Sequence, residues 1–147
     1  MYYKFPKEKS DDALKASDKL VDYLSRRDHS EKELREKLGR RFTADAIRKA
    51  LEEAKERRWL KEPEELAELV AERLHLKGKG YRYIQKYLQD KGLPPVDRTP
   101  DREKEKAHEL LSVKFGDYQS LSYEERQKAF RFLSSRGYDL DTIRSLF

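Results

Sequence analysis

One pattern recurs three times along the chain, and it limits the folds that the chain can adopt. Each copy has a helix-like run, a short basic corner, a capping residue, and apolar residues four and eight positions after the cap. The caps are Ser30, Gly80 and Asp139. A helical unit of about fifty residues buries little apolar surface alone, so it must pack against the neighbouring units to be stable. We therefore predict an all-α protein built as elongated tandem repeats of small three-helix units.

Start and stop signals support the helical interpretation. Ser30 with Glu33 three residues later forms a capping box, and Thr43 precedes the next apolar series. Pro63, followed by two acids, suits the first turn of a helix. No segment alternates apolar and polar residues between hairpin turns, so no strand is expected. Residues 93–101 contain three prolines, so we predict a loop there.

These signals divide the chain into four parts. We predict an N-terminal tail over residues 1–12 and a first helical repeat over 13–61. A second repeat with the Pro-rich loop follows over 62–100, and a third repeat over 101–147.

The composition narrows the classes of protein. Charged residues make up 43% of the 147 residues and hydrophobic residues only 36%, which excludes an enzyme with one large core and raises disorder as an alternative. The regular helical spacing argues against disorder. The absence of cysteine excludes disulfides, thiol catalysis and cysteine-based zinc sites, and favours a cytoplasmic protein. We expect no secretory signal and no membrane span, because neither an apolar leader nor a run of about 18 apolar residues is present.

The charge is distributed unevenly. Residues 52–72 hold eight acids and four bases, whereas residues 73–91 hold six bases and one acid. Tyrosines are interleaved with those bases, a combination that suits phosphates and unpaired bases or an acidic protein groove. The other two basic corners could extend this surface. The predicted partner- or nucleic-acid-binding residues are Arg26, Arg27, Arg35, Lys77, Lys79, Tyr81, Arg82, Tyr83, Lys86, Arg131 and Arg136.

Signals of catalysis or metal binding are weak. His29, His75 and His108 lie far apart with no histidine partner at i+4, so we expect no zinc site and no other cofactor. The run from Gly78 to Gly80 lacks the pattern of a phosphate-binding P-loop and is better explained as a tight interhelical corner. Acids next to lysines are expected by coincidence in so charged a chain. We predict a protein that is not an enzyme.

Three stretches resemble the RecX family, bacterial regulators of the RecA recombinase. The stretch from Arg26 to Leu38, preceded by Leu24, is similar to the signature of the family's first repeat. The second repeat is matched by residues 78–80 with the apolar positions that follow up to Leu93, and the C-terminal repeat by residues 131–138 with Ile143. The matches occur in the family's order and together span about residues 13–147. The Pro-rich stretch at 94–100 departs from the family, which has the third helix of its second repeat there, so the resemblance implies that this helix is reduced or lost.

The resemblance implies a regulator that binds the RecA filament, lies along its groove, and inhibits the ATPase and strand-exchange activities. Contact with single- or double-stranded DNA in the filament is a further implication. We expect a monomer. Two alternatives follow from the residues themselves: a stand-alone basic module that binds nucleic acid, and a helical scaffold whose charges only keep it soluble.

Overall fold

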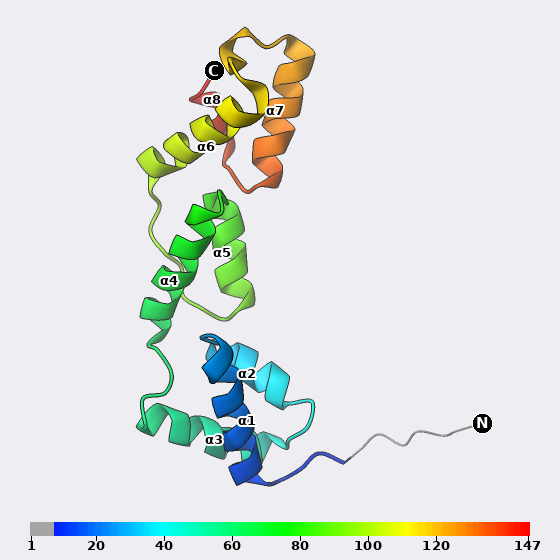
Figure 1. The fold of residues 1–147 in the computed structure, drawn as a ribbon, viewed down its shortest axis with the longest axis vertical. Coiled ribbons are helices and arrows are strands. Elements are labelled where there is room, and N and C mark those ends of the chain that lie inside the picture. Colours follow the sequence, from blue (N-terminus) through cyan, green and yellow to red (C-terminus); the bar gives the residue numbers. More distant parts are fainter. Residues whose placement is uncertain (1–7) are drawn as a thin grey trace, which may run out of the picture. The chain divides into compact units, whose positions relative to one another are not determined.

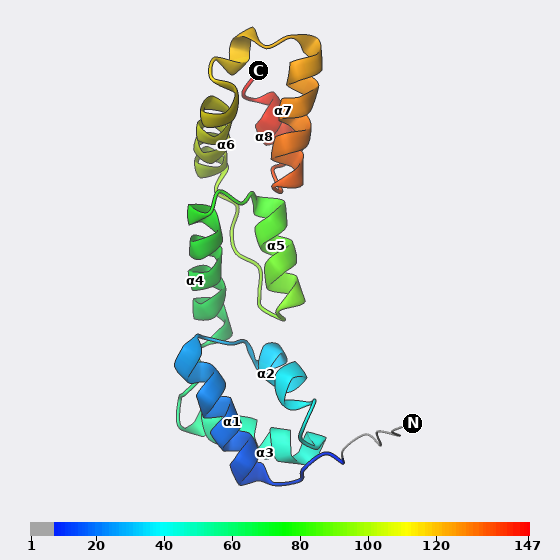
Figure 2. The same ribbon diagram turned by 45° about the vertical axis from the view of Figure 1, so that its right-hand side comes forward.

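The computed structural model describes residues 8–147, which form eight α-helices and one short 3₁₀ helix. Within this range the only β-type pairing is an isolated bridge between Ser10 and Phe42. The prediction of an all-α repeat fold is confirmed. The chain divides into two compact units, unit 1 up to Leu66 and unit 2 over Ala67–Phe147 (Figures 1 and 2). The predicted second and third repeats fall mostly within unit 2.

Unit 1 contains helices α1 (Ala13–Arg26), α2 (Glu31–Leu38) and α3 (Ala44–Glu56). Each begins at a side-chain cap. The carboxylate of Asp12 accepts hydrogen bonds from the first amides of α1, and Thr43 accepts one from Ala46 at the start of α3. Ser30 and Glu33 form the predicted capping box, in which each side chain binds the other's backbone amide. Capping is a short-range property, so sequence predicts it well.

The core of unit 1 lies between α1 and α3, which cross each other (Figure 1). Leu20, Leu34 and Leu38 are almost wholly buried there, and Trp59 packs against the same cluster from the segment after α3. Two apolar residues of α1 lie outside this core: Leu14 is 77% exposed and Val21 43% exposed. Among the described residues of unit 1, the helices α2 and α3 pack against α1, and its remaining surface stays exposed.

Part of the predicted tail is ordered. Its residues 1–7 lie outside the described residues. The amide of Ser10 donates to the carbonyl of Arg41, and the carbonyl of Ser10 accepts from the amide of Thr43. The Thr43 hydroxyl donates to Asp11. Residues 10 and 11 are therefore attached to the loop between α2 and α3.

Unit 2 holds most of α4 (Pro63–Leu76), then α5 (Tyr81–Asp90), α6 (Pro100–Phe115), the 3₁₀ helix η1 (Tyr118–Ser120), α7 (Tyr123–Ser135) and α8 (Leu140–Arg144). Helices α4 and α5 lie side by side, and α8 packs against both α6 and α7 (Figures 1 and 2). Tyr138, Leu111, Leu133 and Ile143 are fully buried in the core of the last three helices.

The Pro-rich segment replaces a helix. Residues 93–99 contain no helix and run back beside α5 to the start of α6 (Figure 2). Leu93 and Val96 are buried, and the amide of Val96 donates to the side chain of Gln85 on α5. The two buried side chains and this hydrogen bond hold the segment in place without a helix. The loop that the prolines predict is present.

Asp139 differs from its prediction as a helix cap. It lies at the N-cap position of α8, but its side chain makes no capping hydrogen bond. One carboxylate oxygen instead binds the guanidinium of Arg98 at 2.5 Å. The sequence could not indicate this, because the two residues are 41 positions apart. Among the described residues, no helix is long and apolar enough to cross a membrane.

Candidate partner-binding surface

The basic corner between α4 and α5, residues 77–80, is packed against the corner between α7 and α8. The amide of Gly80 donates to the carbonyl of Arg136 at 2.8 Å, and the amide of Arg82 donates to the carbonyl of Gly137 at 2.9 Å. A Cβ atom on Gly137 would lie 2.5 Å from the backbone nitrogen of Tyr83, so only glycine fits there. Two basic stretches far apart in the sequence thereby meet at one place in unit 2.

Most cations at this place lack an acidic partner. Across residues 8–147, no carboxylate lies within 4 Å of the side-chain nitrogens of Lys77, Lys79, Arg82 or Arg136. Lys79 lies 4.6 Å from the centre of the Tyr83 ring. An aromatic face attracts a cation without cancelling its charge. We call these four cations together with Tyr83 the basic corner surface.

One further cation, which the sequence did not single out, shares an aromatic ring with Arg136. Lys114, at the end of α6, lies 4.1 Å from the centre of the Phe132 ring. Arg136 lies 4.7 Å from that ring. No feature of the sequence around Lys114 indicates this, because only the packing of α6 on α7 brings it to Phe132. Arg131, which the sequence did predict, is exposed on α7.

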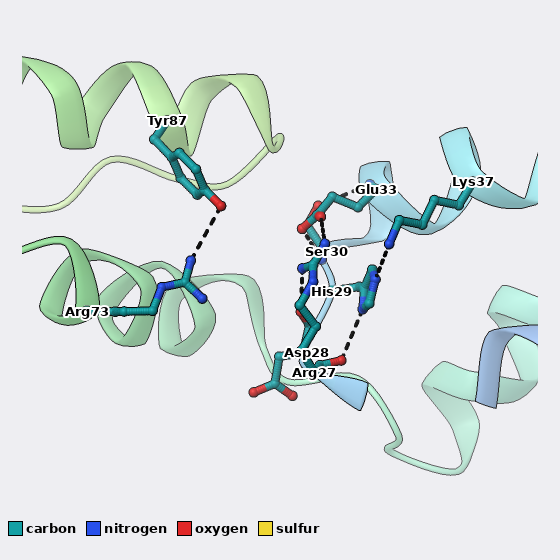
Figure 3. A network of polar contacts seen from close by, with 8 residues as sticks. All are labelled: Arg27, Asp28, His29, Ser30, Glu33, Lys37, Arg73 and Tyr87. Atoms are coloured by element: carbon teal, nitrogen blue, oxygen red, sulfur yellow. Dashed lines mark hydrogen bonds and ion pairs between the residues drawn. The ribbon is translucent and has the colours of Figure 1, made fainter. Parts of the chain in front are cut away.

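Other predicted residues have structural partners. The Tyr81 hydroxyl donates to the carbonyl of Val96, and Arg98 covers its ring at 4.3 Å. Tyr81 therefore holds the Pro-rich segment on α5. Lys86 forms an ion pair with Asp90 at 2.8 Å, one turn along α5. In α4 and α5, Arg73 donates to the hydroxyl of Tyr87 (Figure 3).

The predicted arginines of unit 1 are all bound to carboxylates. Arg26 pairs with Asp22 at 3.4 Å and Arg35 with Glu31 at 2.7 Å. Arg27 binds the carboxylate of Glu33 at 2.7 Å, as Figure 3 shows. In the capping box the other oxygen of that carboxylate accepts from Ser30. Arg27 is thus tied to the start of α2, which gives it a structural role.

Each histidine has a hydrogen-bond partner. The Nδ1 atom of His29 lies 3.0 Å from the carbonyl of Arg27, and its Nε2 atom lies 2.7 Å from Nζ of Lys37 (Figure 3). Burial lowers the pKa of His29 below its usual value. His108 contacts the hydroxyl of Tyr118. Within the described part of the chain, no three side chains of the metal-ligating types come together.

Two family models match the chain. The model described as "RecX, third three-helix domain" matches residues 101–147, and "RecX, first three-helix domain" matches residues 16–53. A regulatory protein RecX from Legionella pneumophila (strain Corby) is 31% identical over 140 residues, which cover 90% of this chain and 93% of the relative. The chain belongs to the RecX family. The two model matches leave the region of α4, α5 and the Pro-rich segment between them.

Further comparisons agree with this membership. The regulatory protein RecX of Clostridium perfringens (strain 13 / Type A) is 32% identical over 94% of this chain and 69% of its own length. That of Pseudomonas savastanoi pv. phaseolicola is 36% identical over 84% of this chain and 83% of its own. The crystal structure of RecX from Lactobacillus salivarius superposes with a TM-score of 0.75 at 22% identity, covering 92% of this chain and 94% of that one. The RecX fold is therefore shared, and the relatives are named regulatory proteins.

Proposed function

We propose that this protein binds the filament of the RecA recombinase and inhibits its ATPase and strand-exchange activities. Membership of the RecX family supports a regulatory role. The observation that carries the proposal further is the basic corner surface, whose four cations have no carboxylate within 4 Å among the described residues. Cations left without an acid inside the protein are available to the acids or phosphates of a partner.

The structure also ranks the predicted contacts. Arg26, Arg27 and Arg35 already bind carboxylates, so a partner would have to compete for them. Within residues 8–147, Lys79 and Arg82 have no carboxylate within 4 Å that would compete with a partner. We therefore assign the main contact of the filament to the α4–α5 corner.

Contact with DNA forms a second part of the proposal. Tyr83 is 37% exposed, and the ammonium group of Lys79 lies over its ring. Cations and aromatic side chains at one place suit a single-stranded nucleic acid. If the protein contacts the DNA of the filament, its affinity falls steeply as salt rises, because phosphate neutralisation releases counterions.

The direct test is a titration of RecA ATPase activity on single-stranded DNA with the purified full chain. We expect hydrolysis to fall as the protein approaches stoichiometry with RecA. A parallel measurement of binding to an oligonucleotide without RecA separates the alternatives. Tight, salt-sensitive DNA binding with no effect on RecA would contradict the proposal and favour a stand-alone nucleic-acid-binding module.

A further inference from the structure

A buried polar cluster lies directly behind the basic corner. Lys106 on α6 reaches the 77–80 corner, and its side chain is only 12% exposed. Its ammonium nitrogen lies 2.5 Å from a carboxylate oxygen of Glu103, 2.7 Å from Nδ1 of His75 and 2.6 Å from the carbonyl oxygen of Lys79. An ammonium group has three hydrogens to donate. Lys106 forms hydrogen bonds with His75 and with the carbonyl of Lys79, and its contact with Glu103 is an ion pair. Lys106 therefore joins α4, α6 and the corner at one point.

Glu103 attaches the start of α5 to the same point. Its second carboxylate oxygen accepts a hydrogen bond from the amide of Tyr81, the first residue of α5. The N-cap residue of this helix is Gly80, which has no side chain to satisfy the free amides. A carboxylate from α6 supplies the missing cap, and its negative charge suits the positive end of the helix dipole.

Hydrogen-bond chemistry fixes the proton on His75. An ammonium group donates and never accepts, so Nδ1 of His75 must carry a lone pair. The bond with Lys106 therefore requires a neutral imidazole with its proton on Nε2. A proton added to Nδ1 would place two donors and two positive charges 2.7 Å apart. Burial and, next, the charge of Lys106 lower the pKa of His75.

The groups around the ring are few. Charged side chains that face His75 come from α4 and α6: Glu72, Arg102, Glu103 and Lys106. Glu72 and Arg102 bind each other at 2.7 Å and 2.9 Å, and this contact lowers the pKa of Glu72. From the α7–α8 corner the buried Tyr138 donates its phenol hydrogen to the carbonyl of Gly78. Burial raises the pKa of that phenol. Among these groups His75 has the ordinary pKa nearest to neutrality, 6.5, and its lowered pKa places its protonation below that value.

We propose that His75, Glu103 and Lys106 are positioning residues that form a proton-sensitive lock on the basic corner. With neutral His75, Lys106 holds the carbonyl of Lys79 while Glu103 holds the amide of Tyr81, and the side chains of Lys77, Lys79 and Arg82 keep fixed positions. Protonation of His75 breaks its bond with Lys106 and loosens the corner. The lock acts on the surface assigned above to the RecA filament, so its effect on inhibition rests on the proposed function.

The test compares the wild-type chain with His75→Asn and His108→Asn. The Asn side-chain oxygen can stand near Nδ1 and accept from Lys106, but it does not titrate. His108→Asn is the matched control, because His108 is exposed and contacts Tyr118 at another place in unit 2. Amide hydrogen-exchange protection factors of Tyr81 and Arg82 are measured by NMR at pH 7.5 and 5.5, with far-UV circular dichroism to show that each protein is folded.

We expect both protection factors to fall about tenfold at pH 5.5 in the wild type and in His108→Asn, the equivalent of one charge-assisted hydrogen bond. We expect His75→Asn to change less than twofold. Equal pH dependence in the wild type and His75→Asn would overturn the lock. So would unchanged protection in the wild type across this range.

Inhibition of the RecA ATPase is then measured with the same three proteins at both pH values. The ratio of half-inhibiting concentrations, wild type to His75→Asn, cancels the pH dependence of RecA itself. We expect this ratio to rise about tenfold at pH 5.5. If no protein inhibits RecA at either pH, the proposed function fails, whereas the exchange data still decide whether the lock exists.

Discussion

Gly80 and Gly137 touch each other backbone to backbone. A Cβ atom on Gly80 would lie 2.5 Å from the carbonyl carbon of Gly137. This contact lets the α4–α5 corner approach the α7–α8 corner closely enough for the hydrogen bond from the Gly80 amide to the Arg136 carbonyl. The basic corner surface is a consequence of this approach.

Substitution of Gly80 by alanine tests the contact. The φ angle of Gly80 is −82°, which alanine adopts without strain, so the methyl clash is the only new cost. The atoms that it meets are backbone and cannot move without breaking hydrogen bonds. We expect Gly80→Ala to lower the free energy of unfolding by about 2 kcal/mol, as overpacking does, measured by urea denaturation.

Gly78→Ala is the comparison for that experiment. Gly78 has a φ angle of +78°, but its Cβ would meet only the Leu110 side chain at an ordinary 3.5 Å. We expect Gly78→Ala to lower the free energy of unfolding by about 1 kcal/mol through backbone strain. The hydrogen-exchange protection of the Arg82 amide should not change in this variant. An equal loss of Arg82 protection in both variants would contradict the role given to the Gly80 contact.

Arg58 offers a stabilising substitution. It is the one described residue other than glycine with a positive φ angle, 56°, and it follows the end of α3. The amide of Trp59 bonds back to the carbonyl of Ala54, and that of Arg58 to Lys55, the pattern of a Schellman motif. Glycine suits this position best, so we expect Arg58→Gly to raise the free energy of unfolding of unit 1 by about 1 kcal/mol. Chemical denaturation, followed by Trp59 fluorescence, measures this.

Arg57→Gly is the matched control, because Arg57 has a φ angle of −82° at the preceding position. There glycine adds freedom to the unfolded chain and removes the ion pair of Arg57 with Glu53 at 3.1 Å, so we expect a loss of stability. A gain in both variants would show that removal of positive charge, and not the backbone angle, is responsible.

The histidines of the two units should carry their protons on different nitrogens. A carbonyl only accepts, so His29 donates from Nδ1 to Arg27 and accepts from Lys37 at Nε2. For His75 the bond with Lys106 requires the opposite tautomer. Long-range ¹H–¹⁵N spectra at pH 7.5 distinguish the two, and the same tautomer at both sites would contradict one of these hydrogen bonds.

The same two residues give the chain an acid-sensitive stability. Burial is the largest cause that lowers the pKa of both His29 and His75 from the usual 6.5. The unfolded chain therefore binds more protons than the folded one just below pH 6.5. The stability that the two neutral histidines contribute is fully present above pH 6.5. It is lost as the pH falls toward their lowered pKa values. Urea midpoints at pH 7.5 and 5.5 check the sign, and a higher midpoint at 5.5 would refute it.

Charge reversal tests the assignment of the basic corner surface. We expect Lys79→Glu with Arg82→Glu to weaken inhibition of the RecA ATPase at least tenfold, because both cations lack an internal acid and would meet the partner directly. Lys15→Glu with Lys49→Glu changes the net charge equally at exposed sites of α1 and α3. An equal loss in both double variants would mean that only net charge matters.

Local signals in the sequence explain much of what was predicted correctly. The capping box at Ser30, the cap at Thr43 and the Pro-rich interruption depend on neighbours within a few positions, and the structure contains all three. Exposure is less local. Leu14 and Val21 are apolar and lie in α1, yet both are exposed, because the width of the covered face of a helix depends on its partners.

Ion pairs also divide into those that local sequence predicts and those that only tertiary packing creates. Pairs one turn apart, such as Arg35 with Glu31, can be anticipated from helical spacing. The pairing of Arg98 with Asp139 and the cluster of Lys106 with His75 join residues 41 and 31 positions apart. No period in the sequence relates such residues.

The sequence by itself determined the helices, their caps, the repeat and the stretch where positive charge accumulates, because each of these arises from residues close together along the chain. Only the tertiary structure decided which cations keep their charge available. Arg26, Arg27 and Arg35 are bound by nearby acids. Packing of two glycine corners instead brings the backbone of Arg136 to that of Gly80, and within residues 8–147 no carboxylate lies within 4 Å of Lys79, Arg82 or Arg136. Coulomb attraction acts over a few ångströms of space, and folding sets that distance.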